Sequence, residues 1–276
     1  MTSDPKTLPL IDRPALSRNR ARALRLGLAD FLHRIAGDEI HFRLEEINRR
    51  FTDTAVISGF PEIWSEIFPQ ARQLHDDDVL DLAPASLDLV IHALALHQSN
   101  DPVGQMVQAA RALRPDGLFI GVVLGGETLA GLRDALRRAE AEMTGGLSPR
   151  SLPMAEIRDW GGLLGRAGLA LPVADQISQK VSYRDLPHLA RDLRAMGETN
   201  ALTARLRSLS RRAIFTRAGE IMAREQADVN DPARISVTYE MIFLTGWSPA
   251  DNQQKPLRPG SATTSLAEAL NSQSKP

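Results

Sequence analysis

Two short and mainly apolar segments in the middle of the chain constrain its fold more than any other feature. They are residues 87–91 and 118–124, and a helical pattern lies between them. Asp101 fits the N-cap of that helix, and Pro102 fits its first position. Apolar strands of this kind are typical of a parallel sheet that helices cover on both faces. The sequence therefore predicts a parallel βαβ unit and an α/β fold.

Hydrophobic periodicity extends this prediction along the chain. A helical pattern covers residues 15–50, and Gly37 is expected to divide it into two helices. Residues 201–225 are expected to form one basic helix. The predicted organisation is a disordered N-terminus (1–14), an N-terminal helical arm (15–50), an α/β domain (51–248) with a helical insertion at about 185–227, and an extended tail (249–276).

Composition excludes several kinds of site. The 276 residues include no cysteine, which excludes disulfides, thiolate metal sites and a cysteine nucleophile. The net charge is −1 and aromatic residues make up 5%, so neither a strong positive field nor a base-stacking surface favours nucleic acid. No apolar run is long enough for a membrane span. We therefore expect a cytoplasmic protein with no nucleic-acid partner.

Several segments then resemble a known superfamily. Residues 80–90 resemble the fourth strand of class I S-adenosylmethionine-dependent methyltransferases, and residues 111–118 resemble the turn before their fifth strand. The resemblance implies a Rossmann-like sheet, mostly parallel with an antiparallel C-terminal strand, and S-adenosylmethionine as the cofactor of a methyl transfer. Four more segments are similar to a bacterial branch close to mitochondrial respiratory complex I assembly factor 5 and related to the biotin-pathway malonyl-carrier methyltransferase: residues 124–129, 145–150, 196–202 and 253–261.

The first predicted strand departs from this superfamily. Its members have a glycine-rich turn there, which lets the backbone approach the cofactor. Here Gly59 is the one glycine that remains, and the bulky residues Phe60 and Trp64 follow it. The interval from Ala55 to Leu87 is also too short for the usual strands and helices. We expect a shortened first half, with the second strand and its helix deleted or reduced, and impaired cofactor binding.

Four residues are candidates for the remaining cofactor site. Gly59 ends the first strand, and the resemblance places Asp76 near the adenine amino group, with Asp77 beside it. His97 matches a loop that borders cofactor and substrate. The alternatives are a solvated acidic turn for the aspartates and a hydrogen-bonded histidine at a strand end. No catalytic residue is assigned. No metal site is expected, because His92 and His97 fall on opposite faces of an extended strand.

Two further features allow alternative interpretations. The glycine turn at residues 125–128 precedes a helix and could receive an anion, or it could be a plain helix cap. The basic segment 205–217 could bind an acidic partner or nucleic acid, or it could be a solvated helix face.

The main functional hypothesis is a protein of the methyltransferase family with impaired cofactor binding. The alternative is a non-catalytic binding or assembly factor for respiratory complex I subunits. Such a factor would bind its partner through the helical arm, the basic helix or the tail. A small-molecule sensor is a third possibility.

Overall fold

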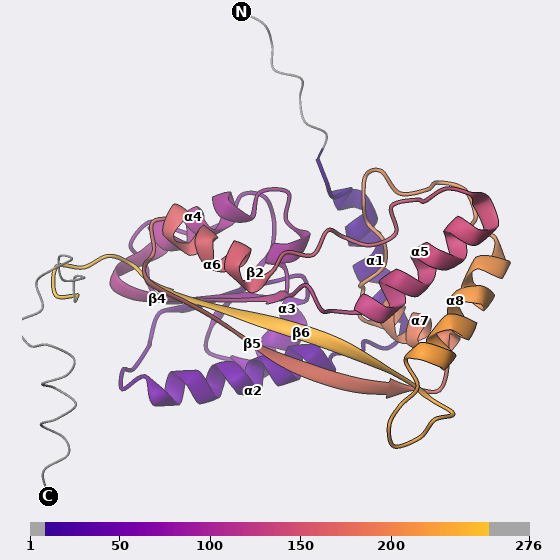
Figure 1. Ribbon diagram of the computed structural model, residues 1–276. Coiled ribbons are helices and arrows are strands. Elements are labelled where there is room, and N and C mark those ends of the chain that lie inside the picture. Colours follow the sequence, from indigo (N-terminus) through magenta and orange to yellow (C-terminus); the bar gives the residue numbers. More distant parts are fainter. Residues whose placement is uncertain (1–8, 254–276) are drawn as a thin grey trace, which may run out of the picture.

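The computed structural model describes residues 9–253 and contains one mixed sheet of six strands, in the order β2-β1-β3-β4-β6-β5 (Figure 1). The first four strands in this order are parallel, and β6 is antiparallel to both β4 and β5. This confirms the predicted α/β, Rossmann-like sheet with an antiparallel C-terminal strand. The strands are β1 (Thr54–Ser58), β2 (Arg72–His75), β3 (Leu87–Ala93), β4 (Leu113–Leu124), β5 (Ala170–Tyr183) and β6 (Ile235–Trp247).

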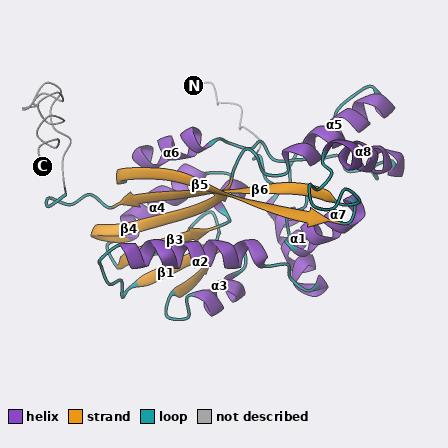
Figure 2. Ribbon diagram, turned by 60° about the horizontal axis from the view of Figure 1, so that its bottom comes forward, coloured by secondary structure: helices purple, strands orange, loops and turns teal. Residues whose placement is uncertain are grey.

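Helices cover both faces of the sheet, which explains why β3 and β4 have no polar face (Figure 2). On one face, α4 (Pro102–Ala112) and α6 (Ile157–Arg166) pack on the sheet through a buried cluster that includes Met106, Trp160 and Phe119. On the other face are α2 (Phe31–Glu46) and α3 (Pro61–Ile67). Asp101 caps α4 by accepting a hydrogen bond from Gly104, as its position in the sequence predicts.

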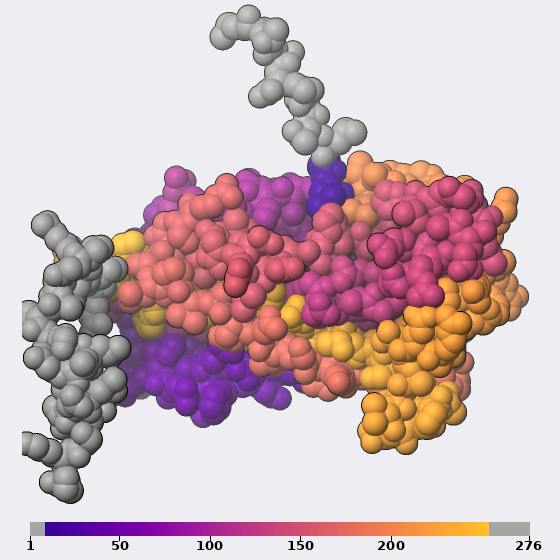
Figure 3. Space-filling model, in the orientation of Figure 1, coloured from indigo at the N-terminus to yellow at the C-terminus, as the bar shows by residue number. Residues whose placement is uncertain are grey.

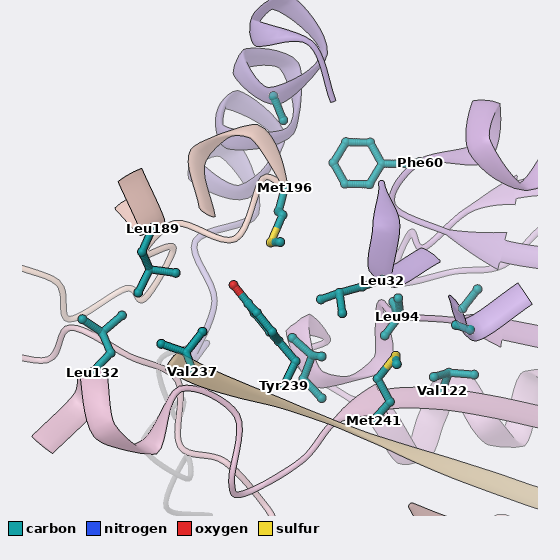
Figure 4. Close-up of a cluster of buried hydrophobic side chains, with 14 of the residues drawn as sticks. Leu32, Phe60, Leu94, Val122, Leu132, Leu189, Met196, Val237, Tyr239 and Met241 are labelled. Carbon is teal, nitrogen blue, oxygen red and sulfur yellow. The ribbon is translucent and has the colours of Figure 1, made fainter. Parts of the chain in front are cut away.

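Four more helices gather beyond the carboxyl ends of the parallel strands, at one end of the molecule (Figures 1 and 3). Figure 4 shows Tyr239 of β6 among apolar side chains at this end, with Met196 and Val237 beside it. Ligands of open α/β sheets bind outside this same edge. The helices are α1 (Arg13–Leu26), α5 (Ala130–Thr144), α7 (Leu186–Ala195) and α8 (Arg212–Glu225).

The division of the first helical region differs from the prediction. The break lies at Gly27, whose φ of +83° ends α1, and not after Gly37. Gly37 lies inside α2, where a Cβ would stand 2.7 Å from Cγ2 of Ile67 in α3. The glycine is therefore explained by close helix packing and not by a chain break.

Two other expectations were wrong because contacts between distant parts of the chain outweigh the local pattern. Residues 11–14 are ordered, because Ile11 is buried and forms an isolated β-bridge with Leu202. The basic helix begins at residue 212 and not at 201. The segment before it is not helical, and Arg205 and Arg207 in this segment form ion pairs with Asp12. Contacts between distant parts of the chain thus replace the helix that local spacing indicated.

The first half of the sheet is shortened, as predicted, but the second strand is present and pairs with β1. No helix or strand is formed over residues 76–86, between β2 and β3, so the shortening falls there. Residues 115–117, predicted as a turn, lie inside β4, where Asp116 has a φ of +65°. Most of the family-like segment 253–261 lies outside the described residues. No helix between residues 9 and 253 is long and apolar enough to cross a membrane.

Candidate functional site

Gly59 directly follows β1 at the edge where a cofactor is expected, but a side chain of this chain fills the space beside it. That side chain is Arg20 of α1, and a Cβ on Gly59 would lie 2.6 Å from both Nε and Nη2 of its guanidinium. The following residues Phe60 and Trp64 are buried in the core. The single remaining glycine therefore leaves room for an arginine.

Asp76 directly follows β2 and is bound by two arginines of α1. Arg20 donates to Oδ1 at 2.6 Å and to Oδ2 at 3.0 Å, and Arg13 donates to Oδ2 at 3.1 Å. The aspartate is 1% exposed. Burial alone would raise the pKa of the Asp76 carboxyl, but the two guanidinium groups outweigh burial and hold this pKa below its ordinary value. Asp76 is thus ionised, and both of its carboxylate oxygens accept hydrogen bonds from arginines.

Asp77 does not join this cluster. Its side chain is 75% exposed and lies 3.8 Å from Arg13. The alternative interpretation, a solvated acidic residue, describes it better than a binding role does.

These contacts test whether the site fits S-adenosylmethionine, the cofactor that the resemblance implies. The cofactor would need the space beside Gly59 for its methionine part and a carboxylate near its adenine. Arg20 fills that space, and both oxygens of Asp76 accept hydrogen bonds from arginines. The residues as arranged do not fit the cofactor.

A chain of polar contacts continues from Arg20 to His97. The Arg20 guanidinium donates to Oε1 of Gln98 at 2.9 Å, and Nε2 of Gln98 donates to Oε2 of Glu198 at 2.6 Å. Nε2 of His97 lies 3.9 Å from Oε1 of Glu198. The His97 side chain is 4% exposed, and neither ring nitrogen has a hydrogen-bond partner among the described residues. Buried polar atoms without a hydrogen-bond partner are uncommon in folded proteins, so both ring nitrogens can bind a water molecule or a ligand group.

His97, Gln98 and Glu198 are among the residues that line a cavity of about 550 Å³. Its walls are mostly apolar, and Tyr239 contributes to them. The volume is in the range of small-molecule and side-chain sites in proteins. Apolar wall residues come from α5, α7 and residues 147–154: Leu129, Leu132, Leu136, Leu147, Leu152, Met154 and Leu193.

The glycine turn at residues 125–128, a candidate anion site by sequence, is occupied by a carboxylate of the chain itself. The backbone N–H of Glu127 donates to Oε2 of Glu240 at 2.9 Å, and a Cβ on Gly125 would overlap this side chain. Glu240 is 5% exposed. The Glu240 carboxylate therefore ties β6 to the turn that precedes α5 and occupies the place an anion would take.

The described residues contain no group of three or more histidine, aspartate or glutamate side chains that could hold a metal ion. Nε2 of His92 lies 2.7 Å from Oε1 of Gln105, so this histidine is tied to α4. Burial lowers the pKa of the His92 imidazole to about 4. His92 is therefore a neutral core residue.

The structure thus brings Gly59, Asp76 and His97 to one edge and leaves Asp77 at the surface. Sequence reasoning missed Arg20, Gln98 and Glu198. Glu198 lies within residues 196–202, one of the family-like segments. That resemblance was the signal in the sequence that could have identified it. Arg20 was one of several arginines in a helical pattern and could not be singled out.

Comparisons with known proteins agree with the resemblance. The chain is 32% identical over 228 residues to a Danio rerio protein named "Arginine-hydroxylase NDUFAF5, mitochondrial", which covers 83% of this chain and 70% of that protein. The Homo sapiens protein of that name is 36% identical over 200 residues, or 72% of this chain and 57% of the relative. The chain therefore spans less than two thirds of the human relative.

Two further proteins to which the chain is similar are named methyltransferases. A malonyl-[acyl-carrier protein] O-methyltransferase of Gallionella capsiferriformans (strain ES-2) is 33% identical, over 68% of this chain and 62% of its own. A solved putative methyltransferase of Bacillus halodurans C-125 is 12% identical, with a TM-score of 0.46, over 76% of this chain and 97% of its own. No protein-family model matches the chain. With its relation to the Danio rerio protein, the chain belongs to the NDUFAF5 family.

Proposed function

We propose that this protein does not use S-adenosylmethionine and that it binds a client polypeptide, a subunit of respiratory complex I. The observation that carries the first part is Arg20, whose guanidinium fills the space beside Gly59 and binds Asp76. A cofactor would have to displace this guanidinium and leave a buried carboxylate short of partners. Removing one partner of a buried ion pair costs about 3–5 kcal/mol.

The cavity next to this site supports the second part. The relatives are named arginine-hydroxylases, which suggests an arginine of the client as the group bound. The apolar walls suit the aliphatic stem of an arginine, and Glu198 lines the cavity with an Oε1 that accepts no hydrogen bond from residues 9–253. Although burial favours the neutral acid, His97 and Arg20 hold the pKa of Glu198 below its ordinary value. Glu198 is therefore ionised and suited to a cation.

Thermal unfolding with millimolar S-adenosylmethionine, and separately with S-adenosylhomocysteine, tests the first part. A ligand at 100 times its dissociation constant would stabilise the protein by about 2.7 kcal/mol. We expect no shift of the unfolding temperature, while an active methyltransferase measured in parallel shifts clearly. A saturable shift with either compound disproves this part.

Affinity purification from cells that contain complex I, followed by mass spectrometry, tests the second part. We expect complex I subunits with the wild-type chain and a marked loss with Glu198→Gln, which removes the negative charge of this one side chain from the cavity wall. Glu220→Gln is the matched control, since Glu220 lies on the surface of α8, away from the cavity. Absence of complex I subunits, or equal recovery with Glu198→Gln, contradicts the client role.

A further inference from the structure

A groove of about 540 Å³ adjoins the cavity. Residues of α1, α7 and the segment 198–210 line it, and it shares Leu132, Arg150 and Glu198 with the cavity. The side chain of Asn19 donates to the backbone carbonyl of Thr199 at 2.9 Å, which holds α1 against this segment. The groove is therefore a continuation of the candidate site towards the surface.

The charges that line the groove are unbalanced. Arg18, Arg22 and Arg194 form no ion pair with any residue between 9 and 253, and Arg194 bonds only to a backbone carbonyl of its own helix. Two more lining arginines have partners, since Arg150 pairs with Glu140 and Arg205 with Asp12. Glu198 is the one acidic residue among the described residues that line the groove. An excess of positive charge remains.

Arg18 and Arg22 are four residues apart on α1, so their side chains share one face of the helix. Like charges at this spacing repel, and a bound anion would relieve that repulsion. Apolar surface lies beside them: Leu206 is 49% exposed and Phe215 is 43% exposed, and both line the groove. Arginines next to exposed leucine and phenylalanine suit a polypeptide with acidic and apolar side chains better than a nucleic-acid backbone.

From this charge complementarity we infer that the groove binds an acidic, extended segment of the client, which continues into the residue whose side chain enters the cavity. The inference rests on the proposed function. It adds that acidic residues flank the side chain bound in the cavity.

The probe is the fluorescein-labelled peptide Glu-Glu-Leu-Arg-Leu-Glu-Glu, measured by fluorescence anisotropy with the full chain. The controls are the same peptide with glutamine, and with lysine, in place of every glutamate. We expect the acidic peptide to bind about tenfold more tightly than the glutamine peptide. That ratio should shrink as sodium chloride is raised from about 50 mM to about 500 mM, because salt screens the contacts.

The double variant Arg18→Glu with Arg22→Glu should weaken binding of the acidic peptide by about tenfold or more and leave the glutamine peptide nearly unchanged. The matched control is Arg158→Glu with Arg166→Glu. These two exposed arginines of α6 lie over the opposite half of the sheet, away from the groove (Figure 1). Circular dichroism checks that each variant is folded.

Several results overturn the inference: no binding of the acidic peptide, equal binding of all three peptides, or an equal loss with the α6 control. Tighter binding of an oligothymidylate than of the acidic peptide makes the groove a nucleic-acid site instead. If Arg18→Glu with Arg22→Glu changes the sedimentation of the protein alone, the groove is a contact between two copies. Equal recovery of complex I subunits with Glu198→Gln would overturn the client role, and a shift with S-adenosylmethionine would overturn the first part of the proposed function. Neither result alters the peptide measurement, so a failure of the proposed function and a failure of this inference are distinguishable.

Discussion

Arg20 and Asp76 are joined by two hydrogen bonds, of 2.6 and 3.0 Å, across 56 residues of sequence. The pair holds α1 against the edge of the sheet where β1 and β2 end. The same guanidinium reaches Gln98 and, through it, Glu198 beside the cavity. One side chain thus fills the expected cofactor space and connects it to the site proposed for the client.

Replacing this arginine should destabilise the protein strongly. Arg20→Ala leaves Asp76 buried with one cationic partner, and we expect the free energy of unfolding to fall by about 3 kcal/mol. Arg20→Lys should recover part of this loss, because it keeps the charge but not the paired hydrogen bonds. Urea unfolding measures the change, with Arg22→Ala of the exposed face as the control. Equal stability of Arg20→Ala and the wild type would show that the pair is not formed in solution.

The fit between Gly59 and Arg20 predicts a coupling between the two positions. Gly59→Ala places a Cβ 2.6 Å from Nε of Arg20, and we expect a loss of about 2 kcal/mol as the guanidinium is displaced. The same substitution should cost clearly less in an Arg20→Ala background, where the space is open. A double-mutant cycle by urea unfolding measures the difference. If the two losses simply add, Arg20 does not occupy this space.

His97 is expected to contribute little to stability. Its buried ring nitrogens have no hydrogen-bond partner among the described residues, and Glu198 lies 3.9 Å away, so His97→Leu should change the free energy of unfolding by no more than about 1 kcal/mol. The same variant should lower recovery of the client, because it removes the polar group beside Glu198. Thermal unfolding checks the predicted stability, and affinity purification checks the predicted loss of the client. A large loss of stability would mean that the imidazole has a structural partner.

Stability should fall in mild acid because of two buried histidines. Burial lowers the pKa of His33, which accepts a hydrogen bond from Trp64, and the pKa of His92, each to about 4 from an ordinary 6.5. The unfolded chain therefore binds more protons between these values. The contribution of the two neutral histidines to the free energy of unfolding is fully present above pH 6.5 and is lost as the pH falls towards 4.

The expected slope is at most about 1.4 kcal/mol per pH unit for each histidine. Urea unfolding between pH 4 and pH 8 measures it. His92→Gln should reduce the slope, whereas substitution of the exposed His75 should not. An unchanged slope in His92→Gln would argue against a neutral, buried His92.

The central βαβ unit could be predicted from the sequence because its signals are local. The apolar segments, the Asp101 cap and Pro102 act within a few residues, and the structure has β3, α4 and β4 as expected. The break inside the first helical region could not be predicted. Gly27 and Gly37 look alike in the sequence, and a contact with Ile67 distinguishes them.

The candidate site was predicted in part. The sequence identified Gly59, Asp76 and His97 and indicated that the cofactor turn is degenerate. It could not identify the residue that lies beside Gly59 and binds Asp76. Arg20 is one of a series of arginines in α1, and only the packing of that helix brings it to Gly59 and Asp76.

The sequence by itself determined the fold class, the family and the loss of the glycine-rich turn, since these depend on residue order and short-range spacing. The tertiary structure decided what fills the space beside Gly59. A buried carboxylate needs counter-charges, and whichever cations the fold places within reach supply them. Here the N-terminal helix supplies Arg13 and Arg20 to Asp76. The pairing depends on three-dimensional distance, which no local pattern in the sequence records.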